Sequence, residues 1–148
     1  MAKPLSIGRV LGVVVLVAGL ILGGGALSQQ TDHSAEMPWQ AVIDAQLEAF
    51  RNGEADAAFG FAARGFHEHY SDSSAFVTDI RQGGYAPLLD SRAHSFGRFQ
   101  IEGDLVRQIV TLQGPDQIVY QAFYTLEQEE AGWRVLGVVL HKQNAVGV

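Results

Sequence analysis

The second half of the chain alternates between extended apolar runs and short polar turns, and this pattern restricts the possible folds more than any other feature of the sequence. The runs are rich in Val, Ile, Phe and Tyr, and they cover about residues 92–101, 105–112, 117–127 and 133–141. The turns between them are Glu102–Asp104, Gln113–Asp116 and Glu129–Gly132. Because turns this short join neighbouring strands as hairpins, the sequence predicts a four-stranded antiparallel meander.

Helical patterns precede the strands. From Pro38, apolar residues recur at helical spacing as far as Phe50, and Gly53 follows where a helix would end. Two shorter helices are expected next, one opened by carboxylates and one preceded by a polar turn that supplies N-caps. The order predicts an α+β domain in which three N-terminal helices pack on one face of a four-stranded antiparallel twisted sheet. The shorter helices are expected from Glu54 to Arg64–Gly65 and from Ser71–Ser74 to Gly83–Gly84.

The predicted strands are apolar on both faces. In the third run, Val119 and Phe123 alternate with Tyr120 and Tyr124, so the two pairs point to opposite sides. One apolar face can cover the helices, and the other needs a partner. We therefore expect a homodimer through the free sheet face, the alternative being a monomer with an apolar surface patch. In the fourth run, the expected alternation separates Leu136, Val138 and Leu140 from Trp133, Val135 and Val139.

The N-terminal part of the chain has the pattern of a targeting or membrane-anchoring segment. Residues 10–27 contain no charge, and Lys3 and Arg9 precede them. Their length lies between that of a secretory signal and that of a membrane-spanning helix, so an N-terminal apolar helix is expected in either case. An uncleaved anchor would place the domain at the cell membrane, on its periplasmic or extracytoplasmic side, and a cleaved signal would release it to the periplasm. The expected divisions are a signal peptide or membrane anchor over 1–28, a linker over 29–36 and an α+β domain over 37–148.

Charge and composition exclude several classes of function. Beyond residue 28, eight basic and sixteen acidic residues remain, which gives a net charge of −8. Nucleic acid is held mainly by Lys and Arg, so binding to nucleic acid is not expected. The chain has no cysteine, which excludes thiol catalysis and thiolate metal sites. It also has no phosphate-binding loop or dinucleotide fingerprint, and no cofactor is expected.

Several segments resemble those of a known family. They are Ala41–Phe50, Ala58–Phe59, Phe61–Ala62, Gly84–Pro87, Phe96–Gly97, Tyr124, Gly132–Arg134 and Gly137–Val138. Over about residues 41–140 the chain is similar to the bacterial domain of unknown function family 4864. This family looks like a branch of the nuclear transport factor 2-like, or cystatin-like, cone folds, which also include ketosteroid isomerases and polyketide cyclases. The resemblance implies a cone-shaped domain and brings no substrate or catalytic residue with it.

A small set of polar and aromatic residues is a candidate ligand site. Gln46 lies in the middle of the apolar face of the first helix, where an amide is costly unless it is hydrogen-bonded. Tyr120 and Tyr124 share one face of a strand, and with Trp133 they would give an apolar pocket with a few hydrogen-bonding groups. The alternatives are that the aromatic residues serve packing, and that a backbone group of the sheet or a Tyr satisfies Gln46.

His67 and His69 are weak candidates for a metal site. On a strand the two imidazoles would share a face, whereas on a helix they would point about 200° apart and could not share an ion. The alternative is that both face solvent.

Cone-fold isomerases need a carboxylate base inside an apolar pocket, and the predicted strand interiors hold none. Asp79 is the only carboxylate that can be placed near a pocket, and a role on the surface is the favoured alternative for it. The sequence therefore favours a small-ligand binding or protein interaction module over an enzyme. The alternative is an isomerase-like or cyclase-like enzyme that acts on an apolar small molecule.

Overall fold

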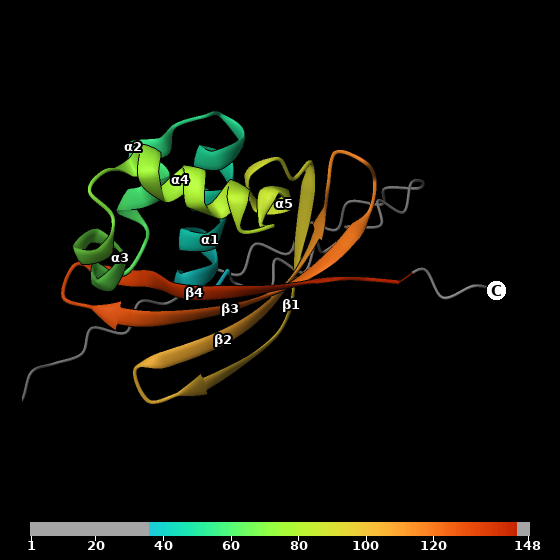
Figure 1. Ribbon diagram of the computed structural model, residues 1–148. Coiled ribbons are helices and arrows are strands. Elements are labelled where there is room, and N and C mark those ends of the chain that lie inside the picture. The colour runs from blue at the N-terminus through green and yellow to red at the C-terminus, as the bar shows by residue number, and fades with distance from the viewer. Residues whose placement is uncertain (1–35, 145–148) are drawn as a thin grey trace, which may run out of the picture. The chain divides into compact units, whose positions relative to one another are not determined.

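The computed structural model describes residues 36–144 (Figure 1). The apolar stretch 10–27 and almost all of the expected linker lie outside these residues, so the expected apolar helix, its cleavage and its membrane attachment stay predictions. In the part of the chain that is described, no helix is long and apolar enough to cross a membrane. The described residues form five helices followed by four strands. The helices are α1 (Pro38–Arg51), α2 (Ala55–Gly60), α3 (Arg64–His69), α4 (Ser73–Gln82) and α5 (Ala86–Leu89). The strands are β1 (Ala93–Glu102), β2 (Leu105–Gln113), β3 (Val119–Glu129) and β4 (Gly132–Lys142).

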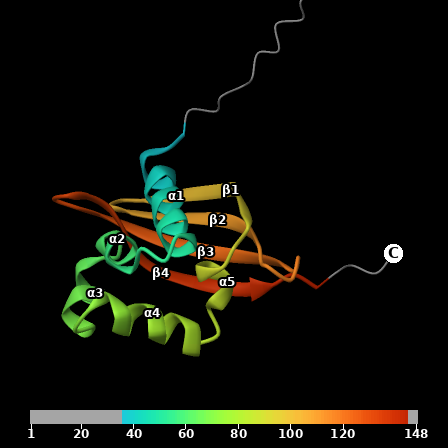
Figure 2. The same cartoon turned by 90° about the horizontal axis from the view of Figure 1, so that it is seen from above.

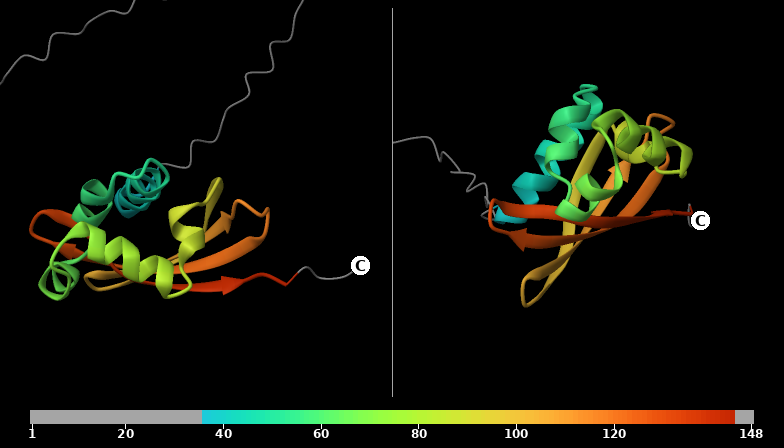
Figure 3. Two further views of the ribbon diagram at one scale, coloured as in Figure 1. Left: turned by 45° about the horizontal axis from the view of Figure 1, so that its top comes forward. Right: turned by 60° about the vertical axis from the view of Figure 1, so that its left-hand side comes forward.

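The expected α+β class is confirmed. The four strands form one antiparallel sheet in the order β1-β2-β3-β4, which is the predicted meander. The helices gather on one face of this sheet, with α1 lying across it and α4 beside β4 (Figures 2 and 3). The other face of the sheet carries no element of the described chain (Figure 3).

The second expected helix is wrong in its extent. It was expected to reach Arg64–Gly65, but α2 ends at Gly60, Phe61 is its C-cap, and Ala62 forms a parallel bridge with Val135 of β4. The backbone N–H of Val135 donates to the carbonyl of Phe61 at 2.9 Å, and the N–H of Ala63 donates to the carbonyl of Val135 at 2.9 Å. These two hydrogen bonds satisfy backbone groups of residues 61 and 63 without a helix, so a separate helix, α3, begins only at Arg64.

The expected division of the apolar residues of the fourth strand is also partly wrong. Opposite Thr125 and Leu126 the register shifts by one residue, so that Leu136 becomes an extra residue in a β-bulge. Beyond the bulge, Val138 stands opposite the inward-facing Tyr124 and joins the core side with Val135. Leu136 instead remains exposed on the outer side of the sheet with Val139.

The core lies between α1 and the inner face of the sheet. Trp39, Ile43 and Leu47 recur on one face of α1, and all three are buried against the strands. The strands contribute alternate residues, as expected for a sheet with one covered face. The buried strand residues are Val106, Val110, Leu112, Ala122, Tyr124, Leu126 and Val135.

A buried glutamine connects this core to the edge of the sheet through hydrogen bonds. Gln108 of β2 points inward and is 1% exposed. Its Oε1 accepts hydrogen bonds from Trp39 Nε1 at 3.0 Å and from Gln40 Nε2 at 3.1 Å. Its Nε2 donates to the carbonyl of Gly97 at 2.9 Å and lies 3.3 Å from the carbonyl of Arg98. These two residues form the bulge in β1, where the register with β2 shifts. Gln108 therefore joins the start of α1 to an irregular strand edge.

Candidate ligand-binding cavity

The described residues line an apolar cavity of about 240 Å³ between the helical layer and β4. Helix α1 supplies one wall, α4 and the chain leading into α5 supply a second, and β4 supplies the floor. The cavity holds no Lys, Arg or His in its lining, and Asp79 is its one carboxylate. The lining residues are Gln46, Phe50, Ala62, Phe66, Phe76, Asp79, Ile80, Gly83, Tyr85, Leu88, Val135, Gly137 and Val138.

Helix α4 presents three of the lining residues because of where it begins. The side chain of Asp72 accepts a hydrogen bond from the N–H of Ala75 at 2.8 Å, and this N-cap starts the helix at Ser73. Phe76 and Ile80 are then four residues apart and share one face, with Asp79 beside them. That face is turned toward the cavity.

Phe76 is the centre of an aromatic cluster that forms one side of the cavity. It is the only buried residue of α4, with 5% of its surface exposed. Its ring centroid lies 5.0 Å from that of Phe59 and 5.8 Å from that of Phe66. Phe50 and Tyr70 complete the cluster at 6.3 Å and 5.6 Å. Phe76 thus attaches α4 to α1, α2 and α3.

Gln46 lies at the inner end of the cavity and is 3% exposed. Its Nε2 donates a hydrogen bond to the carbonyl of Ala58 at 3.1 Å. A backbone partner was among the expected alternatives, but it lies in α2 and not in the sheet. A primary amide has a second N–H and a carbonyl oxygen. These remaining groups are available to the interior of the cavity.

Asp79 lies at the open side of the cavity, since the residue is exposed to solvent and also lines the interior. The hydroxyl of Tyr70 donates a hydrogen bond to its Oδ2. This hydrogen bond is the main cause that raises the pKa of the Tyr70 hydroxyl above its usual value. The sequence favoured a surface role for Asp79 over a place near a pocket, and in the structure the residue is exposed and also lines the cavity.

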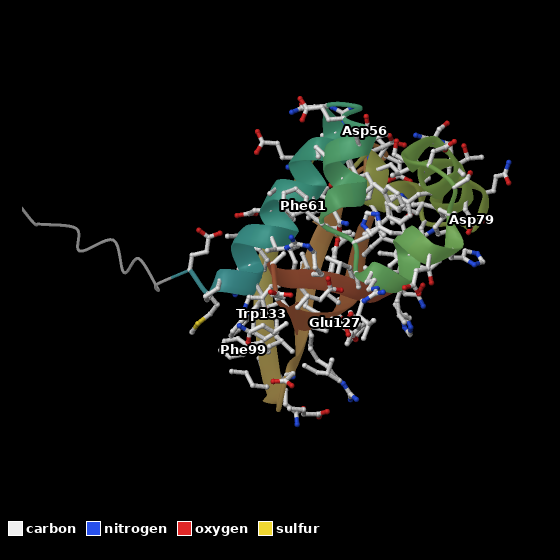
Figure 4. The ribbon with its side chains drawn as sticks, turned by 90° about the vertical axis from the view of Figure 1, so that its left-hand side faces the viewer. Asp56, Phe61, Asp79, Phe99, Glu127 and Trp133 are labelled. Atoms are coloured by element: carbon white, nitrogen blue, oxygen red, sulfur yellow. The ribbon has the colours of Figure 1, made fainter. Side chains whose placement is uncertain are left out.

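The structure does not bring the other three candidate ligand residues into this cavity. Trp133 packs edge-on against Trp39 with ring centroids 5.6 Å apart, and Figure 4 shows it well away from Asp79. Tyr120 is half-buried and paired with Lys142 near the other end of β4. Neither residue lines the cavity. Tyr120 and Tyr124 were grouped because they share one face of a strand, and a shared face does not fix the position along the strand.

Tyr124 is fully buried in the core beneath the helices. Its hydroxyl finds no hydrogen-bond partner within residues 36–144. Burial raises the pKa of this hydroxyl far above its usual value, and the positive charge of Arg51 opposes that shift only in part. Tyr124 therefore acts as a large core residue that keeps its hydroxyl protonated.

The two weak metal candidates lie on a helix. His67 and His69 belong to α3, the arrangement in which the two imidazoles point apart. The ring of His67 lies 4.0 Å from that of Phe59, and His69 packs edge-on against Tyr70 at 4.7 Å. In the described part of the chain, no three His, Asp or Glu side chains are grouped so that they could hold a metal ion.

Some residues of the cavity were missed in the sequence. Tyr85 and Leu88 line it from the segment between the last expected helix and the first expected strand, where no element was predicted and the structure has the short helix α5. The apolar triplet from Pro87 to Leu89 was the available signal, because three apolar residues in a row are rarely left on a surface loop.

Comparisons with known proteins bear on the fold of the domain. The sequence model of the family described as domain of unknown function DUF4864 matches residues 32–148. A nuclear transport factor 2-like protein of unknown function from Silicibacter pomeroyi DSS-3 superposes with a TM-score of 0.51 and 14% identity, covering 72% of this chain and 93% of that one. A second such protein of unknown function, from Shewanella baltica OS155, gives a TM-score of 0.43 and 15% identity, covering 71% and 94%. No curated protein matches the chain. The first superposition shows a nuclear transport factor 2-like fold.

Proposed function

The chain belongs to the DUF4864 family of domains of unknown function, and we propose that this member holds a small apolar molecule in the cavity between α1, α4 and β4. The observation that carries the proposal is the make-up of the lining. Its walls are mostly aromatic and aliphatic, and two polar side chains, Gln46 and Asp79, reach it from different helices. Apolar walls with a few convergent polar groups are typical of small-molecule sites.

The volume of the cavity limits the size of the ligand. Sites for drug-sized molecules measure about 300 to 1,000 Å³, so 240 Å³ is small for such a ligand. An apolar cavity of about 150 Å³ is large enough to bind benzene, so this cavity has room for one ring and a few further atoms. A single ring with a short substituent, or a short branched chain, fits this limit. Ligands of that size bind in the millimolar to micromolar range.

Filling the cavity is expected to abolish binding of a single-ring probe. Val138 lies on the floor of the cavity, and Val138→Trp would place an indole in the space a ligand needs. We expect the purified full chain to bind benzyl alcohol in ligand-observed NMR, and the variant to bind it at least about tenfold more weakly.

Val139→Trp is the matched control for that experiment. Its side chain is on the outer side of the sheet and 52% exposed, so the probe should bind as it does to the unaltered chain. Equal binding by the unaltered chain and the Val138→Trp variant would contradict the proposal, as would no binding by the unaltered chain.

A second proposed role is self-association through the outer face of the sheet. Ile109, Phe123 and Val139 stand opposite one another on three neighbouring strands and form an apolar row across that face. Phe123 is 37% exposed and Val139 52% exposed. With strands about 4.8 Å apart and 3.3 Å per residue, four strands of about nine residues span roughly 600 Å². That area approaches the roughly 800 Å² per partner of a stable interface, which favours a second copy of this chain as the partner.

Introducing a charge into this row is expected to shift the protein to monomer. Phe123→Asp would bury two carboxylates in a two-fold interface without partners. Sedimentation of the full chain at tens of micromolar should show dimer, and the variant monomer. Thr78→Asp on the exposed side of α4 makes the same charge change in the other layer and should leave the dimer intact. A monomer before any substitution would refute the dimer.

A further inference from the structure

We propose that the cavity selects a ligand with a positively charged head, of the class of small amines with an apolar body. The inference rests on the proposed binding function and adds the sign of the ligand's charge. Three features of the described residues support it: the unpaired carboxylate at the entrance, the aromatic walls and the absence of a cation from the lining.

The carboxylate of Asp79 has no cationic partner within residues 36–144. The arginines of the helical layer are engaged elsewhere, and His69, which lines a second hollow together with Asp79, forms no ion pair with it. Arg81 pairs with Asp90 at 3.1 Å, and Arg64 pairs with Glu68 at 2.9 Å. Within the described residues, no ion pair joins Asp79 to a Lys, Arg or His, and none of these residue types lines the cavity. A cationic ligand would supply the missing charge.

The hydrogen bond from Tyr70 leaves this carboxylate able to accept another donor. The hydroxyl of Tyr70 uses Oδ2 and holds the side chain of Asp79 in one direction. An ionised carboxylate has acceptor sites on both oxygens and no hydrogen to donate. Oδ1 is therefore open to a donor such as an ammonium group. A hydrogen bond of that kind is stronger when the donor is charged.

The aromatic lining favours the same sign of charge. Phe50, Phe66 and Phe76 line the cavity, and so does Tyr85, which lies between the end of α4 and the start of α5. The faces of aromatic rings are electronegative and attract ammonium groups that come within about 6 Å. At the inner end, Gln46 offers a neutral amide whose carbonyl oxygen can accept a further hydrogen bond. An anionic ligand would meet the carboxylate and the ring faces without any cation to offset them.

Three probes that share one benzene ring and are close in size separate the sign of the charge from the size of the ligand. They are benzylamine, benzyl alcohol and benzoate, measured on the full chain by ligand-observed NMR at low salt. We expect benzylamine to bind about tenfold more tightly than benzyl alcohol, and benzoate to bind more weakly than both. Raising the salt concentration should weaken benzylamine several-fold and leave benzyl alcohol unchanged, because only the first interaction is screened.

Asp79→Asn tests the residue that carries the preference. The asparagine keeps an oxygen that can accept the hydrogen bond from Tyr70 and removes the charge. Affinity for benzylamine should fall to that for benzyl alcohol, whose own affinity should not change. Glu48→Gln removes the same charge from the exposed side of α1, away from the cavity lining, and should change both affinities by less than about twofold.

The possible outcomes distinguish this inference from the function on which it rests. If benzyl alcohol binds and benzylamine binds no better, or if Asp79→Asn leaves benzylamine unchanged, the charge preference is overturned and the cavity remains a binding site. Tightest binding by benzoate overturns it in the same way. If none of the probes binds, the proposed function itself fails. If the asparagine variant proves unstable, Tyr70→Phe is measured in its place. This variant keeps the carboxylate and removes its hydrogen-bond donor, and we expect it to retain the preference for benzylamine.

Discussion

Replacing Gln108 by leucine is expected to lower the free energy of unfolding by about 3 to 4 kcal/mol. Leucine is close to glutamine in size, so the loss comes from hydrogen bonds and not from a cavity. The indole N–H of Trp39 would lose its acceptor at a buried position, and the carbonyls of the bulge in β1 would lose their donor. A buried polar group left without a partner costs about 1 to 3 kcal/mol, and the substitution also removes the part-buried hydrogen bonds to Gln40 and to the carbonyl of Gly97.

Chemical denaturation followed by tryptophan fluorescence measures this effect, because Trp39 is itself a partner of Gln108. Gln113→Leu is the matched control, since the residue lies at the exposed end of the same strand, and it should change stability by less than about 0.5 kcal/mol. Should Gln108→Leu unfold at the same denaturant concentration as the unaltered protein, the network would have no role in stability.

Replacing Phe76 by alanine is expected to cost about 3 to 5 kcal/mol and to remove ligand binding at the same time. The truncation leaves a void at the centre of the aromatic cluster and removes the only buried side chain of α4. Since whole domains are stable by about 5 to 15 kcal/mol, the loss is a large share of the total. Helix α4 forms one wall of the cavity, so a probe should lose its site even where the sheet stays folded.

Thermal unfolding and benzyl alcohol binding, measured on the same samples, test both parts of this prediction. Phe76→Leu keeps much of the apolar volume and should fall between alanine and the unaltered protein. Thr78→Ala changes an exposed residue of the same helix and should leave stability within about 0.5 kcal/mol. Full probe affinity in a folded Phe76→Ala variant would show that α4 is not a wall of the binding site.

The regular parts of this fold could be predicted from the sequence because their patterns are local. The apolar spacing from Trp39 to Phe50 and the glycine at 53 place α1 within two residues of its observed ends. The alternating strands and short turns give the whole antiparallel meander. Each of these signals depends only on neighbours in the chain, and nothing from another element opposes it.

The errors arose where a distant element decides the local structure. The end of α2 depends on Val135, which lies more than seventy residues away in β4 and draws residues 61–63 out of a helix. The sequence does not reveal the bulge at Leu136, because the strand has apolar residues on both faces whether or not its register shifts there. The position of the cavity depends on how α4 lies beside β4, and no local pattern contains that information.

Gln108 could have been identified from the sequence as a buried polar residue, and it was missed. Gln108 is a polar residue at an inward position between Val106 and Val110, just as Gln46 is a polar residue on an apolar helix face. The argument that made Gln46 a candidate applies equally to both. The sequence could show that each amide needs a partner, but not which one. Gln46 found its partner in α2, whereas Gln108 found several on two other elements.

The two edges of the sheet have a consequence for how copies of this domain behave at high concentration. A bare strand edge invites another chain to add to the sheet, which is a common start of aggregation. Here the β1 edge is interrupted by the bulge at Gly97 and Arg98, and part of the β4 edge is occupied by residues 61–63. Neither edge therefore offers an unbroken row of backbone donors and acceptors along its full length. The domain is therefore protected against open-ended strand addition, and under the proposed self-association two copies would meet on the outer face of the sheet, away from both edges.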